Sequence, residues 1–426
     1  MQLFKITGGR PLSGAVTISG AKNSVLPIMA AAALTGRSCT LHNCPAISDV
    51  RDTAEILRCL GCNVDAAGST IRIDSEQMDD WRVPGELAGQ MRASILFLGM
   101  LLARFGRAEI AYPGGCRLGS RPIDLHLDAL RQMGAEVEET ERGLSCRCEK
   151  LHGCEITLPY PSVGATENIL LAAMGCRERV ILHGAAREPE VEDLTRFLNC
   201  AGAEISGGDG ELTIRGGTLG GTVYPIQPDR METATYLCAA AGCGGDVTLK
   251  RTDGAANTAL LEILSDCGCT LQTGVDTLRL KAENRLKLPR HVTTGPYPAF
   301  PTDAQAPLMA ALLRGEGETR ITETVFEDRL RHAYQMQKLG ADIEVHQNTA
   351  LLRGTERLHG AALRAEDLRG GAALVLAALQ AEGKSSLTGV KFIKRGYDRI
   401  EERLSSLGAD INCVEIPDSI VYNTKI

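Results

Sequence analysis

The chain has 426 residues, a formal net charge of −7 at pH 7 and 44% apolar residues. These values are typical of a compact, enzyme-sized protein of two or three domains, at about 150 residues per domain. Lys, Arg, Gly or Pro interrupts every apolar run before it reaches transmembrane length, and residues 1–10 carry no secretory signal. An acidic chain without a basic tract is not expected to bind nucleic acid. We expect a cytoplasmic protein with no membrane insertion.

One short pattern returns six times along the chain. An apolar helical face ends in Leu or an equivalent residue, and Gly, a small residue and an extended stretch follow it. The glycines are 66 to 73 residues apart, too regular for chance and too long for a solenoid, and they are Gly61, Gly134, Gly202, Gly268, Gly340 and Gly408. Each is expected to end a helix and turn the chain into a strand. The fold is therefore expected to contain six similar units.

The first half of each unit also repeats. It consists of a polar residue, an Ala- and Leu-rich segment, a Gly and a β-branched or apolar stretch, with clear copies at 162–182, 229–249, 302–321 and 367–387. An Ala-rich helix without a clean polar face is expected to be buried on most sides. We therefore predict an α/β fold of two groups of three units, in which sheets enclose buried helices.

The fifteen cysteines point to reduced thiols, because the count is odd and the chain is expected to be intracellular. Cys62 belongs to a CxxC pair, which could be half a zinc site or a redox pair. However, Cys62 and Cys269 fall where four other units have Ala, so both are expected to be small buried residues. Cys146, Cys148 and Cys154 lack the second CxxC or the His pair of a zinc ribbon.

Cys116 has different surroundings. It lies in PGGCRLGSRP, residues 113–122, which contains too much Gly and Pro for regular structure. Arg117 and Arg121 lie within five residues of it, and nearby positive charge lowers the pKa of a thiol from about 8.5. These residues alone fit a reactive, anion-facing thiol and an incidental thiol in a surface loop equally well.

Other polar residues stand at the expected starts of buried helices. Lys22 precedes the apolar run 25–33, so its ammonium is expected near a helix start, where anions are favoured; otherwise it is a solvated surface residue. Asp303 could bind a ligand or be the N-cap of the next helix. Ser162 opens a helix whose first N–H groups could bind phosphate, or it could only cap that helix.

The segment 113–126, PGGCRLGSRPIDLH, resembles the catalytic loop of the UDP-N-acetylglucosamine 1-carboxyvinyltransferase family of enolpyruvyl transferases. Further matches follow in the family's order. They are SGAKN at 19–23, MRAS at 91–94, SVGATEN at 162–168, AAREPE at 185–190, FPTD at 300–303, DLR at 367–369 and RGY at 395–397. The resemblance thus extends over the whole chain.

This resemblance implies the fold. The family has a two-domain inside-out α/β barrel, built from six βαβαββ-like repeats, three in each domain. One domain is expected at 22–229, with the Cys116 loop and the nucleotide-binding segments. The other is expected at 1–21 plus 230–426, with Asp303 and Arg395. The active site is expected in the cleft between the two domains.

The resemblance also implies the reaction. The family transfers the enolpyruvyl group of phosphoenolpyruvate to the 3′-hydroxyl of UDP-N-acetylglucosamine and releases phosphate, the first committed step of peptidoglycan precursor synthesis for the cell wall. Cationic clamps, one acid and one base suffice, so no metal or organic cofactor is expected. Cys116 would be the general acid, able to hold a covalent phosphoenolpyruvate adduct and alkylated by fosfomycin. Asp303 would be the candidate base.

Residues that bind the two substrates follow from the same motifs. Phosphoenolpyruvate would contact Lys22, Asn23, Arg121 and Arg395, of which Lys22 and Arg395 are also counted as catalytic. UDP-N-acetylglucosamine would contact Arg92, Arg121, Pro122, Ile123, Asp124, Leu125, Ser162, Val163, Gly164, Asp303 and Val325. These two small molecules are the expected partners, and protein partners are left open.

A few positions depart from the family pattern. Phe392 and Lys394 stand where the family usually has His and an acidic residue, and Gly370-Gly371 is expected to loosen the helix start after Arg369. Two alternatives therefore stay open. One is 5-enolpyruvylshikimate-3-phosphate synthase, which shares the architecture but lacks the cysteine loop. The other is a catalytically weak paralogue that binds UDP-sugar as a regulator or scaffold.

Overall fold

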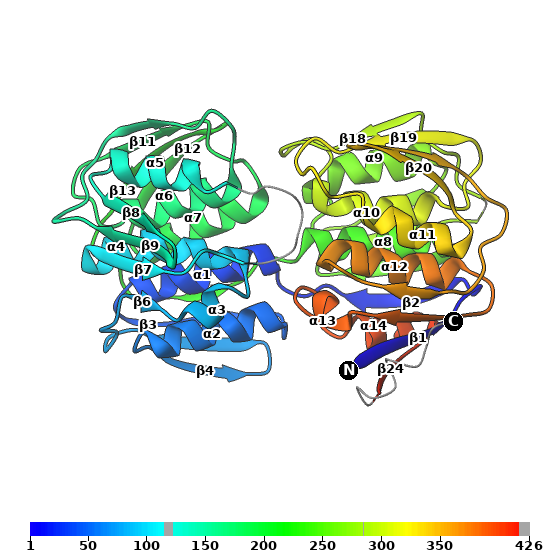
Figure 1. Ribbon diagram of the computed structural model, residues 1–426, viewed down its shortest axis with the longest axis horizontal. Helices are drawn as coiled ribbons and strands as arrows, with labels where there is room; N and C mark the ends of the chain where they lie inside the picture. Colours follow the sequence, from blue (N-terminus) through cyan, green and yellow to red (C-terminus); the bar gives the residue numbers. More distant parts are fainter. Residues whose placement is uncertain (115–121, 284, 417–426) are drawn as a thin grey trace. The chain divides into compact units, whose positions relative to one another are not determined.

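The computed structural model describes residues 1–114, 122–283 and 285–416. Two compact units divide these residues: a middle unit, residues 20–114 with 122–227, and a terminal unit, residues 1–19 with 228–416. Both ends of the described chain thus belong to one unit. In Figure 1 the blue strands β1 (Gln2–Thr7) and β2 (Leu12–Thr17) lie among the orange and red elements of the terminal unit.

Three four-stranded sheets form the outside of the middle unit. In the order of hydrogen-bonded neighbours they are β14 (Val223–Pro225), β3 (Ser38–His42), β5 (Thr70–Asp74) and β4 (Asn63–Ala67); β6 (Arg82–Val83), β7 (Arg107–Ile110), β9 (Gly143–Arg147) and β8 (Glu136–Thr140); and β10 (Glu155–Thr157), β11 (Val180–His183), β13 (Glu211–Arg215) and β12 (Glu204–Gly208).

The helices of the middle unit fall into an inner and an outer set. The inner helices are α1 (Lys22–Leu34), α4 (Phe97–Phe105) and α6 (Val163–Ala173), and the outer ones are α2 (Ser48–Cys59), α5 (Asp124–Gln132) and α7 (Pro189–Ala201), with α3 (Gly85–Ala88) and the 3-10 turn η1 (Arg92–Leu96) between them. In α1 every residue from Ser24 to Leu34 is buried. Short Ala and Leu side chains let the inner helices pack on all sides, as the sequence predicts.

The terminal unit repeats this plan. Its sheets are β22 (Ala362–Arg364), β23 (Lys384–Thr388), β1 and β24 (Asp410–Glu415); β2, β15 (Gly245–Lys250), β17 (Thr277–Lys281) and β16 (Thr270–Thr273); and β18 (His291–Thr293), β19 (Glu318–Thr322), β21 (Thr349–Arg353) and β20 (Asp342–His346). Its inner helices are α8 (Arg230–Cys243), α10 (Thr302–Leu312) and α12 (Leu368–Gln380), and its outer ones are α9 (Thr258–Asp266), α11 (His332–Met336) with the turn η3 (Gln337–Leu339), α13 (Val390–Ile393) and α14 (Ile400–Ser406), with the turn η2 (Ala255–Asn257) before α9.

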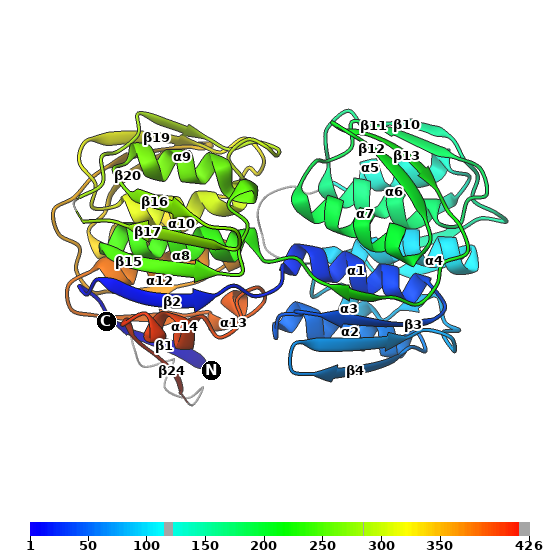
Figure 2. The same cartoon turned by 180° about the vertical axis from the view of Figure 1, so that it is seen from behind.

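All six sheets of the described residues share one topology. In each, one outer pair of strands is parallel and the other two pairs are antiparallel, as in β14–β3, β3–β5 and β5–β4. The N-terminal strands complete two sheets of the terminal unit, because β1 lies between β23 and β24 and β2 runs parallel to β15. Figure 2 shows β2 beside β15. Six similar units in two groups of three are therefore confirmed.

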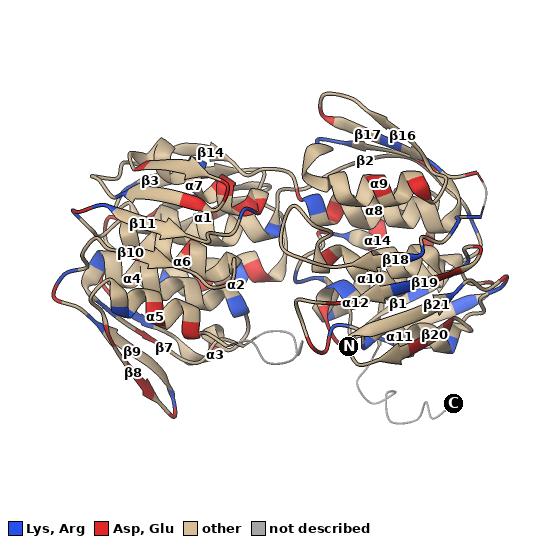
Figure 3. Ribbon diagram, turned by 90° about the horizontal axis from the view of Figure 1, so that it is seen from above, with Lys and Arg blue, Asp and Glu red and all other residues tan. Residues whose placement is uncertain are grey.

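The repeated glycines have the conformation that the pattern predicts. All six have φ between 91° and 114°, in the left-handed region where a side chain is strained. Each follows an outer helix or turn, such as α2 before Gly61 and α14 before Gly408, and precedes an antiparallel strand. Charged residues lie mainly on the sheets, loops and outer helices, as Figure 3 shows for α2, α5 and α9.

The expected loosening of α12 at Gly370-Gly371 is wrong. The helix is regular from Leu368, because Asp367 Oδ1 accepts a hydrogen bond from the Gly370 N–H at 2.8 Å and its carbonyl accepts one from Gly371. A Cβ at position 371 would lie 2.8 Å from the Ile393 side chain. Glycine thus allows α12 and α13 to pack closely.

Cys62 and Cys269 lie in the cores of the two units. Each is 6% exposed, so the prediction of small buried residues is confirmed. In the part of the chain that the structure describes, no helix has both the length and the apolar character needed to span a bilayer.

Candidate active site

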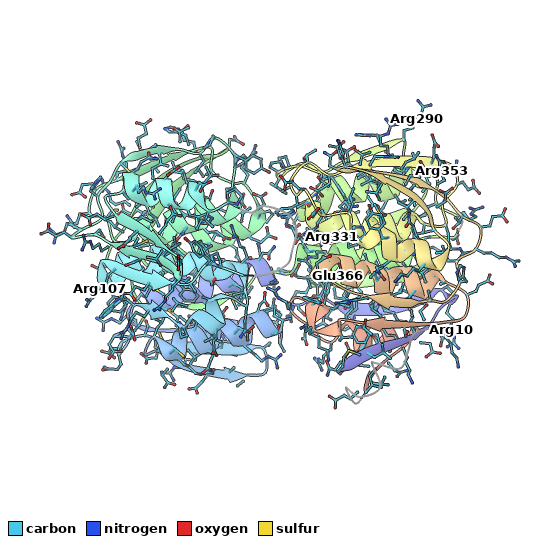
Figure 4. The ribbon with its side chains drawn as sticks, in the orientation of Figure 1. Arg10, Arg107, Arg290, Arg331, Arg353 and Glu366 are labelled. Carbon is cyan, nitrogen blue, oxygen red and sulfur yellow. The ribbon has the colours of Figure 1, made fainter. Side chains whose placement is uncertain are left out.

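Asp303 lies in the first turn of α10 and is held by two buried arginines. Its Oδ1 accepts a hydrogen bond from Arg329 Nη2 at 2.6 Å, and its Oδ2 accepts one from Arg369 Nε at 3.0 Å. The arginine side chains are 4% and 3% exposed, whereas that of Asp303 is 28% exposed. Arg290 and Arg353, by contrast, project outward (Figure 4). Asp303 is the exposed end of an otherwise buried ion cluster.

The Arg369 guanidinium also lies over the ring of Tyr397, 5.3 Å from its centroid. Burial disfavours the charge on Arg369, but the interactions with Tyr397 and Asp303 outweigh burial and raise its pKa above the ordinary value. Among the described residues, Arg329 Nε and Arg369 Nη1 are buried donors without a hydrogen-bond acceptor. Such donors beside a partly exposed carboxylate suit a site that receives an anion.

Asp303 is not the N-cap of its helix, so that alternative is wrong. The helix begins at Thr302, Pro301 occupies the N-cap position, and no side chain caps the helix there. Thr302 Oγ1 donates instead to Glu323 Oε2 at 2.8 Å. Glu323 Oε1 accepts from the Val325 N–H at 2.7 Å, so one buried glutamate joins the start of α10 to the loop that carries Val325. Val325 itself is half-buried and not a core residue.

Arg395 lies between α13 and α14, is half-buried, and its N–H donates to the Phe392 carbonyl. The neighbouring Lys394, which departs from the family pattern, reaches other groups. Its Nζ is 3.8 Å from Glu401 Oε1 and 3.9 Å from Cys413 Sγ. Part of its charge is therefore neutralised by Glu401.

In the middle unit, Lys22 is the first residue of α1, as predicted. Its Nζ is 2.8 Å from Asp49 Oδ2, in the first turn of α2, and the two side chains are 12% and 3% exposed. Lys22 is therefore no ordinary solvated lysine. Asn23 follows it and is exposed.

The predicted nucleotide-binding residues of the middle unit come together at the starts of α5 and α6. Arg92 opens η1, and its Nη2 donates to the Pro122 carbonyl at 3.2 Å. Helix α5 begins two residues after Pro122. Four residues around this start are exposed or half-buried and so open to a ligand: Pro122, Ile123, Asp124 and Leu125.

Helix α6 begins beside α5. Ser162 is its N-cap and accepts from the Ala165 N–H at 3.3 Å, so the capping role of Ser162 is confirmed. Val163 and Gly164 follow in the first turn. A Cβ at Gly164 would lie 3.1 Å from Cε1 and 3.3 Å from Nε2 of His126. Glycine is therefore the residue that fits closely against the His126 ring.

His126 on α5 and Asn168 on α6 lie beside these residues, and the sequence predicts no role for either, although both belong to motifs that match the family. Asn168 Nδ2 faces His126 Nδ1 at 3.1 Å and the Ile95 carbonyl at 3.2 Å, and its Oδ1 accepts from the Gly99 N–H at 2.7 Å. Burial, with a smaller effect of Arg92, lowers the pKa of His126 to about 4. The ring is thus neutral at pH 7, accepts at Nδ1 and carries its proton on Nε2, beside Gly164.

Two predicted residues, Cys116 and Arg121, lie outside the described residues. The structure thus brings together two groups. One is Arg92, Pro122–Leu125 and Ser162–Gly164 in the middle unit, and the other is Asp303 and Val325 in the terminal unit.

Comparisons with known proteins concern the chain as a whole. The model of the EPSP synthase (3-phosphoshikimate 1-carboxyvinyltransferase) family matches residues 6–404. A UDP-N-acetylglucosamine 1-carboxyvinyltransferase of Halorhodospira halophila is 44% identical over 423 residues, 98% of this chain and all of that one. UDP-N-acetylglucosamine 1-carboxyvinyltransferase 2 of Caldanaerobacter subterraneus subsp. tengcongensis is 43% identical over 413 residues, 96% of this chain and 99% of that one. The chain belongs to the UDP-N-acetylglucosamine 1-carboxyvinyltransferase family.

Solved structures support the fold of this family. The enolpyruvyl transferase NikO of Streptomyces tendae has a TM-score of 0.89 at 28% identity, over 98% of this chain and 99% of that one. An EPSP synthase from Acinetobacter baumannii has a TM-score of 0.75 at 20% identity, over 97% and 100% of the two chains, and shows the fold alone. The inside-out α/β architecture expected from the sequence is confirmed.

The two arginines that hold Asp303 differ in how far the sequence indicates them. Arg369 ends the DLR motif, so the sequence marks its position without indicating its role. Arg329 lies in no quoted motif, 26 residues after Asp303. A buried arginine paired with a motif carboxylate cannot be distinguished from a surface arginine by local sequence.

Proposed function

We propose that this chain transfers the enolpyruvyl group of phosphoenolpyruvate to the 3′-hydroxyl of UDP-N-acetylglucosamine and releases phosphate. The observation that carries the proposal is the partly exposed carboxylate of Asp303, held by Arg329 and Arg369 within a chain that is 42–44% identical to transferases of that name. In the cell this reaction would serve peptidoglycan precursor synthesis, hence cell shape and division, in the cytoplasm.

Asp303 would act as the base in the addition step. It would take the proton of the 3′-hydroxyl while the hydroxyl oxygen forms a bond to C2 of phosphoenolpyruvate. Arg329 and Arg369 each hold one carboxylate oxygen, and the carboxylate stays 28% exposed. The anionic phosphate and carboxylate of the substrate would compete for the two arginines, of which Arg329 Nε and Arg369 Nη1 have no hydrogen-bond acceptor. That competition would free a carboxylate oxygen of Asp303 for the hydroxyl proton.

Cys116 would be the acid of the same step and would deliver its thiol proton to the methylene carbon of phosphoenolpyruvate. The addition then gives a tetrahedral carbon that bears both oxygens. In the elimination step the bond from C2 to the phosphate oxygen breaks and the methyl carbon returns one proton to the Cys116 thiolate, which restores the double bond. Asp303 would give its proton to the departing phosphate. Lys22 and Arg395 would stabilise the phosphate as negative charge develops on it.

The UDP-sugar would bind at the starts of α5 and α6 in the middle unit. Both helices present their first N–H groups there, and Arg92 adds a positive charge. Helix N-termini and arginine together suit a diphosphate. The neutral His126 would present its Nε2–H at the same place. Val325 would contact the sugar.

The test is phosphate release when the protein is mixed with phosphoenolpyruvate and UDP-N-acetylglucosamine, without added metal. Release with shikimate 3-phosphate as the acceptor instead would favour 5-enolpyruvylshikimate-3-phosphate synthase, the activity after which the matching family model is named. Binding of the UDP-sugar without release from either acceptor would favour the regulatory paralogue and contradict the proposal.

A further inference from the structure

Ser19 is the last residue that the N-terminal segment contributes to the terminal unit, three positions before Lys22. All of its polar groups are bound within that unit. Its N–H donates to Glu232 Oε2 at 2.7 Å, its carbonyl accepts from the Asp229 N–H at 2.8 Å, and its hydroxyl accepts from Arg403 Nη2 at 2.6 Å. The position at which the chain leaves the terminal unit is therefore closely fixed.

The next two residues are fixed in the middle unit. A Cβ at Gly20 would lie 1.8 Å from the Asn43 carbonyl oxygen, so only glycine fits there. The Ala21 N–H donates to the Gln227 carbonyl at 2.8 Å, and helix α1 begins at Lys22. Residues 20 to 22 thus have defined places within the middle unit, directly after Ser19.

Arg403, on α14, is the residue that joins these contacts. Its Nη2, which donates to the Ser19 hydroxyl, also donates to Asp398 Oδ2 at 3.3 Å. Its Nη1 donates to the Thr17 carbonyl at 2.7 Å and to Glu232 Oε1 at 3.0 Å. Arg403 is 18% exposed and Glu232 is 3% exposed. Asp398 lies three residues after Arg395. One guanidinium therefore connects the segment that leads to Lys22 with the segment that follows Arg395.

The chemistry of the cluster requires arginine. A planar guanidinium has five N–H donors in a fixed fork, so it can serve four acceptors on three segments at once. A lysine ammonium is a point charge on a flexible stem and cannot span the same acceptors. Glu232 accepts from Arg403 with one oxygen and from the Ser19 amide with the other, so it belongs to the same network.

We propose that Arg403 is a positioning residue for enolpyruvyl transfer, which fixes the segment that leads to Lys22 and the segment that follows Arg395. The inference rests on the proposed function, because it assigns both cations to phosphoenolpyruvate. Arg403 acts through these residues and does not touch substrate. Its loss should weaken phosphoenolpyruvate binding and leave the UDP-sugar sites of the middle unit unchanged.

The experiment compares Arg403→Met with a matched control, Arg285→Met. Arg285 also donates to backbone carbonyls of the terminal unit, those of Arg314 and Gly315, but far along the chain from both segments. We expect Arg403→Met to raise the KM for phosphoenolpyruvate at least tenfold, with the Kd of UDP-N-acetylglucosamine within twofold. Arg403→Lys should restore only part of the loss, and Arg285→Met should change neither constant.

Hydrogen exchange gives a readout that does not depend on turnover. In the substrate-free protein, the amides of residues 18–23 should exchange at least tenfold faster in Arg403→Met than in the wild type or the control. Ser19→Ala, which loses one acceptor, should show a smaller effect of the same kind and serves if Arg403→Met fails to fold.

Unchanged exchange at 18–23 with an unchanged KM for phosphoenolpyruvate would overturn the proposal. Equal losses for both substrates would also overturn it, because that result indicates a general structural role. A wild-type protein that releases no phosphate would refute the proposed function instead. In that case the exchange at 18–23 alone would decide whether Arg403 fixes this segment.

Discussion

Lys22 and Asp49 form a nearly buried ion pair between the first turns of α1 and α2, with 2.8 Å between Nζ and Oδ2. A carboxylate removed this far from water needs a partner, and the lysine is held in one direction by it. The pair gives Lys22 a fixed orientation that a solvated lysine lacks.

Asp49→Asn should therefore weaken phosphoenolpyruvate binding through Lys22. We expect the KM for phosphoenolpyruvate to rise about tenfold, equivalent to about 1.4 kcal/mol, and kcat to fall by a smaller factor. Steady-state kinetics with each substrate varied in turn checks this. Glu55→Gln on the same helix is the control, because Glu55 is exposed and pairs only with Arg58 among the contacts described. An unchanged KM in Asp49→Asn would show that the pair only stabilises the fold.

Asp303→Asn should lower kcat by at least 100-fold and leave UDP-N-acetylglucosamine binding within a few-fold, because an amide cannot take the hydroxyl proton. Isothermal titration of the UDP-sugar separates the two effects. The variant leaves Arg329 and Arg369 without their countercharge, so its melting temperature must be measured first. Asp328→Asn, at an exposed carboxylate paired with Arg331, is the matched control. A variant that is folded and active would exclude Asp303 as the base.

The repeat could be predicted from sequence because it is a local signal. A glycine with positive φ after an apolar helical face can be recognised within ten residues, and this signal located all six units. The partners of Asp303 could not be predicted, since Arg329 and Arg369 are 26 and 66 residues away and their pairing depends on how α10, α12 and the loop before α11 pack. The partial burial of Val325 depends on its loop in the same way, since an isolated valine gives no local sign that it is half-buried and not in the core.

Gly164→Ala should weaken UDP-N-acetylglucosamine binding. The added methyl would press on the His126 ring at the start of α6, and we expect a five- to twentyfold rise in Kd with little change in stability. Ser162→Ala is the complementary variant. It removes the cap of the same helix and should cost about 1 kcal/mol of unfolding free energy. Similar Kd values for wild type and Gly164→Ala would exclude this helix start from the nucleotide site.

Fosfomycin should alkylate Cys116 alone among the fifteen cysteines. Many of the others are chemically protected, since burial raises the pKa of Cys44, Cys62, Cys146 and Cys176 to about 12. Mass spectrometry of the digested protein locates the adduct. The exposed Cys59 and Cys200 are internal controls that should react with iodoacetamide but not with fosfomycin. An adduct elsewhere, with position 116 unmodified, would contradict the role of Cys116.

Glu232 should give the protein a characteristic dependence of stability on pH. Burial, opposed by Arg403 and assisted by Asp229, raises its pKa to about 7, with Asp398 and Tyr236 also near the cluster. Because the unfolded pKa is about 4.3, the folded state binds more protons than the unfolded state between these values.

The contribution of Glu232 to the free energy of unfolding is therefore full below pH 4, falls as the pH rises toward 7 and is constant above it. Glu232→Gln removes this titration. We expect the stability of the wild type relative to Glu232→Gln to decrease between pH 5 and pH 7 and then to level off. Urea denaturation of both proteins at half-unit steps of pH measures the difference. A difference that increases with pH over this range would mean that Arg403 keeps Glu232 ionised and that its folded pKa lies below the unfolded value.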